Sequence, residues 1–284
     1  MIVKLGAFNT LKVVKTVDFG VYLDGDEEGE ILLPTRYVPE GTAPDDMLRV
    51  FLYLDNEERM IATTLEPKIQ VGQFAYLQVA WTNQFGAFLD WGLMKDLFVP
   101  FSEQRIKMEQ GNSYIVYCHI DDESNRIVAT GKIEHYLSHE IPEYTEGEEV
   151  NILVWQKTDL GFKAIVENKF AGLIYDNEIF RSLKTGDQLT AFIKPIREDG
   201  KIDLILQKQG YEPVDDFADQ FYSYLQQHEG STTFNDKSSP TEIYDEFKVS
   251  KKVFKKAIGE LYKRHNILID KDCIKLTSKP KQQK

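Results

Sequence analysis

A short motif that returns at domain-sized intervals constrains this chain most. Residues 18–23 (DFGVYL) come back as residues 84–89 (QFGAFL), and more loosely as residues 159–164 (DLGFKA). The glycines of the three copies lie 66 and then 75 residues apart, so each interval has the size of a small domain. Each copy is a strand-like run with a glycine inside it, and such a glycine usually marks a β-bulge. We therefore expect three related β domains.

The expected bulge predicts how two aromatic rings of one copy come together. In a regular strand, positions three apart face opposite sides, so Phe19 and Tyr22 would be separated. One extra residue shifts the phase and brings both rings to one surface, and the same holds for Phe85 and Phe88. Rings exposed on a small β-barrel form a platform on which bases can stack. The alternative is that these rings belong to the barrel core, because aromatic residues are common in strands.

Short strand patterns separated by turn signals fill each interval. Five runs are expected in each repeat, and this favours small barrels. The expected strands of the first repeat are 10–16, 19–23, 31–33, 49–54 and 60–64. Those of the second repeat are 75–82, 85–89, 97–99, 114–120 and 126–130. Those of the third repeat are 151–155, 161–166, 172–175, 188–193 and 201–206.

The period of the hydrophobic residues becomes helical near residue 211. After a first helix, a capping box at Ser239–Glu242 predicts the start of a second, and Ser250 predicts the start of a third that runs to about His265. A hairpin at 267–276 follows, and three helices with a hairpin are the order of a winged helix. The chain is thus predicted to be mainly β with a C-terminal α+β module. The predicted domains are 1–67, 68–144, 145–211 and 212–284.

Charge is segregated along the chain. The net charge of −12 argues against nucleic acid, but residues 1–67 hold 6 cations against 13 acids, whereas residues 237–284 hold 13 cations against 6 acids. Such asymmetry is a hint of polyanion binding at one end. In the third helix, helical spacing puts the lysines opposite an apolar side that includes Tyr262. These lysines are Lys252, Lys255, Lys256 and Lys263. A solvated lysine face is the alternative interpretation.

Motifs for other functions are poor. There is no nucleophile elbow, phosphate-binding loop, zinc cysteine pair or dinucleotide fingerprint. His135 and His139 are four residues apart and could ligate a metal on a helix, but a linker between repeats is the simpler interpretation. Two distant cysteines and the lack of an apolar run of 18 residues favour a cytoplasmic protein without membrane contact. We expect no enzyme activity, no cofactor and no metal, and the oligomeric state stays open.

The Phe-Gly-x-aromatic strand and the following Leu-Leu-Pro or Phe-Val-Pro strand resemble those of S1 domains, which are RNA-binding OB-folds. Three such domains before a winged helix resemble the bacterial conserved virulence factor B family of RNA-binding regulators. The resemblance implies single-stranded RNA binding, no cofactor, and an effect on gene expression during or after transcription. It also implies that both aromatic residues of the repeated strand face RNA. S1 domains often carry a histidine in the third strand, where this chain has Leu33, Val99 and Tyr175, and only Tyr175 keeps a ring.

The third repeat loses the repeated rings, with Leu160 and Lys163 in their place, but keeps more cations than the others. The RNA-binding residues predicted over the whole chain are Phe19, Tyr22, Phe85, Phe88, Lys157, Lys163, Tyr175, Lys194, Lys252, Lys255, Lys256 and Lys263. Two other functions remain open at this point. The winged helix could read DNA as part of a transcription regulator, or the acidic barrels could form a scaffold that contacts a ribosome- or polymerase-associated protein.

Overall fold

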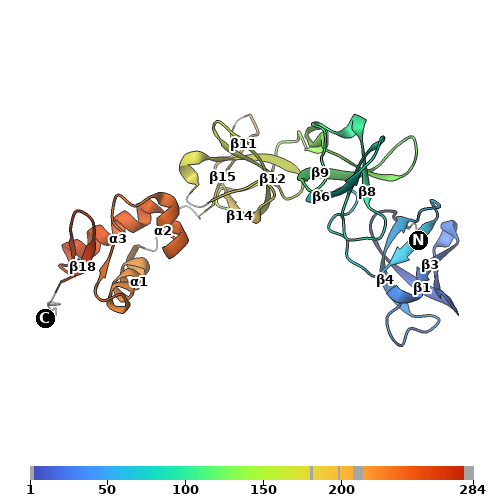
Figure 1. The fold of residues 1–284 in the computed structure, drawn as a ribbon, viewed down its shortest axis with the longest axis horizontal. Helices are drawn as coiled ribbons and strands as arrows, with labels where there is room; N and C mark the ends of the chain where they lie inside the picture. Colours follow the sequence, from blue (N-terminus) through green and yellow to red (C-terminus); the bar gives the residue numbers. More distant parts are fainter. Residues whose placement is uncertain (1–2, 180–181, 198, 207–213, 278–284) are drawn as a thin grey trace. The chain divides into compact units, whose positions relative to one another are not determined.

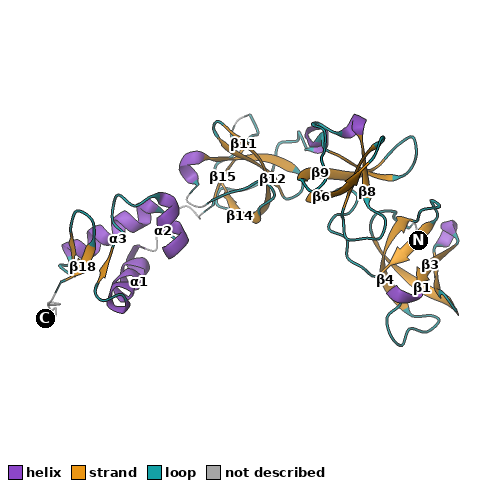
Figure 2. Ribbon diagram, in the orientation of Figure 1, coloured by secondary structure: helices purple, strands orange, loops and turns teal. Residues whose placement is uncertain are grey.

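The computed structural model describes residues 3–179, 182–197, 199–206 and 214–277. Three segments each close into a five-stranded barrel, and a module of helices with a small sheet follows (Figures 1 and 2). The first barrel consists of β1 (Phe8–Val17), β2 (Gly20–Asp24), β3 (Glu30–Pro34), β4 (Met47–Leu54) and β5 (Met60–Thr63). The second consists of β6 (Phe74–Thr82), β7 (Gly86–Leu89), β8 (Leu97–Pro100), β9 (Ser113–Ile120) and β10 (Ile127–Thr130). The third consists of β11 (Glu149–Thr158), β12 (Gly161–Val166), β13 (Phe170–Tyr175), β14 (Gln188–Ile193) and β15 (Ile202–Ile205).

All three barrels have the same topology. Along each sheet the order is first, second, third, fifth and fourth strand, and the fourth returns to pair with the first. The third and fifth strands run parallel, as β3 and β5 do, while the other pairs of the first barrel are antiparallel. Burial alternates along the strands, so that Ile31 and Leu33 are buried and Leu32 between them is not. The expected barrels and the mainly β class are confirmed.

The β-bulge does not lie at the repeated glycine. In each barrel the register shifts in the preceding strand, between Val13 and Lys15 in the first barrel. The glycine itself is required by a close approach of backbone: a Cβ on Gly20 would lie 2.1 Å from the carbonyl oxygen of Leu33. Gly86 and Gly161 meet the same obstacle, at 2.2 and 1.9 Å from a carbonyl oxygen of the next strand. The motif therefore specifies contact between the second and third strands, and the expectation of a bulge at the glycine was wrong.

The first two barrels belong to one compact unit, which extends to His139 and includes Asn168–Phe170. The first barrel has its own core, which includes Leu23 and Leu33, and a second core is shared between the two barrels. In this shared core Phe51 of β4 packs edge-on against the buried Trp91, with ring centroids 5.8 Å apart. The second compact unit holds most of the third barrel and the C-terminal module. The predicted boundary at 211/212 falls at residues 207–213, outside the described residues.

The C-terminal module consists of α1 (Val214–Gln227), β16 (Ser231–Thr232), α2 (Pro240–Phe247), α3 (Lys251–Lys263), β17 (Ile267–Ile269) and β18 (Ile274–Leu276). Its sheet has the order β16-β18-β17, and the short β16 was not expected from the sequence. The predicted capping box is present, because Ser239 accepts a hydrogen bond from the Glu242 amide while the Glu242 side chain accepts one from the Ser239 amide. Ser250 caps α3 by accepting from the Val253 amide at 3.2 Å. None of the helices within the described ranges is long and apolar enough to cross a membrane.

Candidate nucleic-acid interface

The two rings of the first barrel lie on one surface. Phe19 occupies the turn before β2 and is 57% exposed, and Tyr22 lies within β2 and is half-buried. Their rings meet edge to face, with centroids 6.2 Å apart. Because Phe19 belongs to the turn, its ring can fold over the strand, and the turn rather than a bulge at Gly20 brings the two rings together. Neither ring belongs to the buried core of the barrel.

The corresponding rings of the second barrel have different surroundings. Phe85 lies in the turn before β7 and is 62% exposed. The half-buried Phe88 stacks on Trp81, with centroids 3.7 Å apart and planes 3° from parallel. The Phe88 ring also contacts the ring of Phe98 in β8, in a tilted arrangement. The Trp81 indole N–H donates to the Asp96 carboxylate at 2.7 Å, so its ring is fixed in place. The surface thus presents a rigid aromatic cluster with Phe85 at its edge.

The third barrel offers an aliphatic side chain in the same place. Leu160, which replaces the turn ring, is 62% exposed. Lys163, which replaces the strand ring, is exposed, and its ammonium group lies 5.0 Å from the centroid of the buried Trp155 ring. The register shift of this barrel falls at Trp155, whose side chain is buried. This barrel can attract phosphate at Lys163, but it lacks the paired rings of the other two.

The predicted third-strand positions were shifted by one residue in two of the barrels. Leu33 and Val99 are fully buried in their barrels. The residues that lie beside the repeated glycines are Pro34 and Pro100, since they pair with Gly20 and Gly86. In the third barrel this place belongs to Tyr175, which is half-buried.

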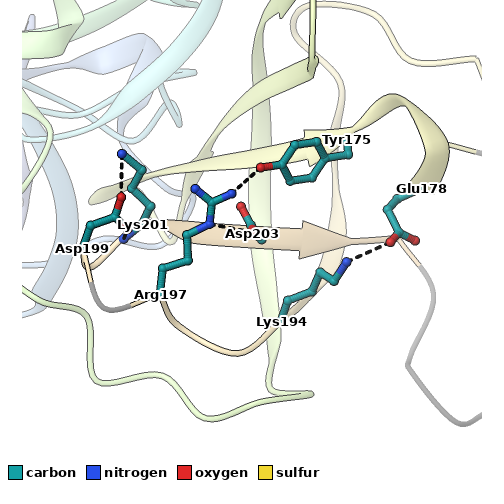
Figure 3. A network of polar contacts seen from close by, with 7 residues as sticks. All are labelled: Tyr175, Glu178, Lys194, Arg197, Asp199, Lys201 and Asp203. Atoms are coloured by element: carbon teal, nitrogen blue, oxygen red, sulfur yellow. Dashed lines mark hydrogen bonds and ion pairs between the residues drawn. The ribbon is translucent and has the colours of Figure 1, made fainter.

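Most predicted cations of the third barrel are paired with carboxylates. Lys194 donates to Glu178 at 2.9 Å (Figure 3). Lys157 pairs with Asp176. Arg197, which follows β14, donates to Asp203 at 3.0 Å and to the Tyr175 hydroxyl. The hydrogen bond to Asp203 raises the pKa of the Arg197 guanidinium.

Such pairs are exposed or half-buried, so each contributes little to stability and can be exchanged for a phosphate contact. The third barrel is therefore a nearly neutral surface with cations held in place by acids, rather than a strongly positive one.

The lysines of α3 lie where helical periodicity put them. Lys252, Lys255, Lys256 and Lys263 are all exposed. The opposite side of the helix is buried in the core of the module, through Val253, Phe254, Ala257, Ile258 and Leu261. Tyr262 was expected on that buried side but is 52% exposed. It lies at the edge of the lysine face because it is one position beyond Leu261, and a step of one residue turns the helix by about 100°. Apart from the backbone of its own helix, no atom lies within 4 Å of where a Cβ on Gly259 would be, so nothing packs over this face at that position.

The first barrel carries acids beside its rings. Asp24, Asp26, Glu27, Glu28 and Glu30 are all exposed around the short helix η1 (Asp26–Glu28). This concentration of negative charge repels phosphate and offsets part of the stacking that Phe19 and Tyr22 offer.

A metal at the two histidines finds no support in the geometry. The 3-10 helix η4 (Ile133–Tyr136) contains His135 but ends before His139, so the two side chains do not share a helical face. The described residues contain no group of three or more histidines, cysteines and acids that could hold a metal ion.

Some surface residues near the platform were missed from the sequence. Phe98 joins the aromatic cluster, and Phe101, which follows β8, is 43% exposed. The signal for Phe98 was available, because alternation along β8 puts it on the side opposite Leu97 and Val99. Trp81 pairs across the sheet with Phe88, and this register depends on the unexpected bulge.

Comparison with known proteins assigns the ends of the chain to two domain families. Residues 5–65 match the family model of the S1 domain, and residues 219–276 match that of the CvfB-like winged helix domain. The chain is 26% identical over 269 residues to the uncharacterized protein YitL of Bacillus subtilis, covering 91% of this chain and 89% of that protein. It is 25% identical to conserved virulence factor B of Staphylococcus aureus, covering 83% of each. The resemblance to the conserved virulence factor B family is thereby confirmed.

Among solved structures, the chain matches a multidomain protein with nucleic acid binding domains from Streptococcus pneumoniae. It is 24% identical, the match covers 96% of this chain and 98% of that chain, and the TM-score is 0.43. The S1 and winged helix families are typically nucleic-acid-binding and non-enzymatic. The predicted fold, of S1-type barrels followed by a winged helix, is confirmed, and a nucleic acid is the class of ligand that it suggests.

Proposed function

We propose that this protein binds single-stranded RNA in the cytoplasm, without catalysis or a cofactor, and regulates gene expression after transcription. Two surfaces contribute to binding: the third barrel and the lysine face of α3. The observation that carries the proposal is the exposure of four lysines on one side of α3, opposite its buried side. The lysine face of α3 attracts a polyanion, whereas the acidic parts of this protein, whose net charge is −12, repel it.

Single-stranded RNA fits the exposed groups better than a duplex does. Lysines contact phosphates without reading sequence, and rings such as Tyr175 of the third barrel and Tyr262 of α3 stack on unpaired bases. The residues that read base edges in a major groove are Arg, Asn and Gln. None of the residues of α3 (Lys251–Lys263) is an Arg, Asn or Gln, and its exposed face consists mainly of lysines.

A charge-removal experiment tests the proposal. Lys252, Lys255 and Lys256 are changed together to Ala, and affinity for a labelled single-stranded RNA is measured over a range of salt concentrations. Removing one lysine–phosphate interaction lowers the slope of log K against log salt by about 0.7 for a single strand, so a drop of up to about 2 is expected. A matched variant changes three lysines outside the proposed surfaces, Lys12, Lys68 and Lys107. Unchanged affinity and slope in the α3 variant, or an equal effect in the matched one, contradicts the proposal.

DNA binding by the winged helix is the alternative with a specific observation in its favour. In such modules a helix enters the major groove, and α3 is a 13-residue helix with an exposed basic face. Competition of the bound RNA by duplex DNA of the same length separates the two functions. Displacement at equal concentrations by duplex, but not by single strands, favours a DNA-binding regulator.

A scaffold function gains support from the acids around η1, which suit a basic protein partner. Changing Asp26, Glu27 and Glu28 to their amides leaves RNA affinity unchanged or higher if RNA is the ligand. The same change abolishes capture of a ribosome- or polymerase-associated protein if the barrels are a scaffold.

A further inference from the structure

A cleft of about 550 Å³ lies between the first and second barrels, inside the compact unit that the two barrels form. The shared core fixes its walls, because Phe51 and Tyr53 of β4 are buried together with Trp91 of the second barrel. The second barrel lines the cleft with Phe85, Phe88 and Phe98. Phe85 is mostly exposed, and the other two rings pack against each other, with centroids 4.9 Å apart.

Polar groups from both barrels lie around these rings. Asn56 and Glu58, in the turn between β4 and β5, line the cleft from the first barrel. Arg126 reaches across from the second barrel and pairs with Glu58. Lys95 also reaches across and donates to the backbone oxygen of Asp55 at 2.7 Å. These two contacts hold the width of the cleft, and burial lowers the pKa of the Lys95 ammonium.

The composition of the cleft selects one kind of occupant. Its volume is within the range of about 300–1,000 Å³ that small-molecule sites have. Two cations, Lys95 and Arg126, are balanced by two acids, Glu58 and Asp96, so the site does not attract a free phosphate. The exposed Phe85 ring beside the apolar Phe88 and Phe98, together with a mixture of donors and acceptors, suits a flat, neutral heterocycle that stacks on one face and forms hydrogen bonds along its edge. An RNA base has these properties.

We infer that the cleft receives one unpaired base of a bound RNA strand and prefers a base with an exocyclic amino group to uracil. The inference rests on the proposed RNA binding and gives the first barrel a part in it, through the turn that holds Asn56 and Glu58. Phe85, at the mouth, stacks on the entering base, and the carboxylates accept hydrogen bonds from its amino group, as acids do from the amino group of cytosine.

Two neighbouring glutamates provide a matched test. Glu58 lines the cleft, whereas Glu57 in the same turn does not line it and instead pairs with Arg59 at 2.8 Å. Glu58→Gln and Glu57→Gln therefore each remove one negative charge, at neighbouring positions of the same turn. Affinities of the full-length variants for ten-nucleotide oligo(C), oligo(A) and oligo(U) are measured by fluorescence anisotropy. We expect Glu58→Gln to weaken oligo(C) and oligo(A) about five- to tenfold and oligo(U) less than twofold, and Glu57→Gln to match the wild type.

Further variants separate a base pocket from a structural contact. Asn56→Ala removes a lining group that takes no part in the ion pair across the barrels and should weaken oligo(C) by about threefold or more. Phe85→Ala should weaken all three oligonucleotides, and more than Phe19→Ala does, since Phe19 has the same place in the first barrel but lies outside the cleft. Equal effects of the two glutamate variants, with Asn56→Ala at wild-type affinity, overturn the inference while leaving RNA binding intact.

Two other outcomes separate a failure of the inference from a failure of the proposed function, or assign the cleft to another ligand. Failure of the wild type to bind any oligonucleotide contradicts the proposed function itself and the inference with it. Binding of cytidine 5′-monophosphate that depends on Glu58, without any effect of Glu58→Gln on the oligonucleotides, assigns the cleft to a free nucleotide and also overturns the strand-bound base.

Discussion

Restoring a ring in the third barrel should increase its affinity for RNA. Leu160 lies in the turn where the other barrels have Phe19 and Phe85, and its exposure of 62% equals that of Phe85. Leu160→Phe therefore adds an exposed ring without removing any buried contact, and a surface change of this kind alters stability by less than about 0.5 kcal/mol. The third barrel is also close to neutral, so repulsion of phosphate does not cancel the gain.

The expected gain follows from the energy of stacking. A base stacked on an aromatic side chain contributes about 1–3 kcal/mol relative to alanine. Leucine already offers an apolar contact, so we take the lower end, about 1 kcal/mol, which corresponds to about fivefold in affinity. The measurement is a fluorescence anisotropy titration of a labelled ten-nucleotide RNA at constant, moderate salt.

The control makes the same change at an exposed leucine outside the platform. Leu65, which follows β5, is 40% exposed, and Leu65→Phe should leave RNA affinity within twofold of the wild type. An affinity of Leu160→Phe within twofold of the wild type refutes the reasoning. An equal gain in both variants refutes it too, because added apolar surface alone would then explain the result.

Two further predictions concern stability. Gly86→Ala forces a Cβ to within 2.2 Å of a backbone oxygen, so it should lower the free energy of unfolding by about 1–3 kcal/mol and let urea unfold the barrel at a lower concentration. Gly259→Ala meets open space beside α3 and should instead raise the free energy of unfolding of the module by up to about 1 kcal/mol. A stabilising Gly86→Ala together with a destabilising Gly259→Ala contradicts both accounts. Burial raises the pKa of the Cys118 thiol from its ordinary value of 9.0 to about 12. The stability that the buried neutral thiol contributes is therefore complete below pH 9 and is lost as the pH rises toward 12. Iodoacetamide at mildly alkaline pH should accordingly alkylate Cys273 and spare Cys118 until the protein is denatured, and mass spectrometry that finds both modified in the native protein contradicts this.

Local patterns in the sequence were sufficient to predict the barrel strands and the three helices, but not the short β16. Alternation along the strands and capping signals at Ser239 and Ser250 act within a few residues, so the barrels and α3 follow from them. The reason for the repeated glycine did not follow, because the backbone oxygen opposite Gly20 belongs to another strand, and pairing register is a property of the sheet. The location of the bulge was missed for the same reason.

The candidate site was only partly predictable because charges find partners through the fold. Lys194 and Lys157 read as available cations in the sequence, yet each meets a carboxylate from a distant position, Glu178 or Asp176. The cleft between the first two barrels was missed entirely. It depends on the shared core around Phe51 and on the contact between Glu58 and Arg126, and these residues come from different repeats.

Crosslinking to cellular RNA, followed by mapping of the linked peptides, tests the central claim most directly. The account predicts links in α3 around Lys255 and Tyr262 and in the third barrel around Lys163 and Tyr175, with additional links at Phe85. Links confined to the first barrel around Phe19 would contradict it. So would a yield of linked RNA no higher than that of the variant in which Lys252, Lys255 and Lys256 are changed to Ala.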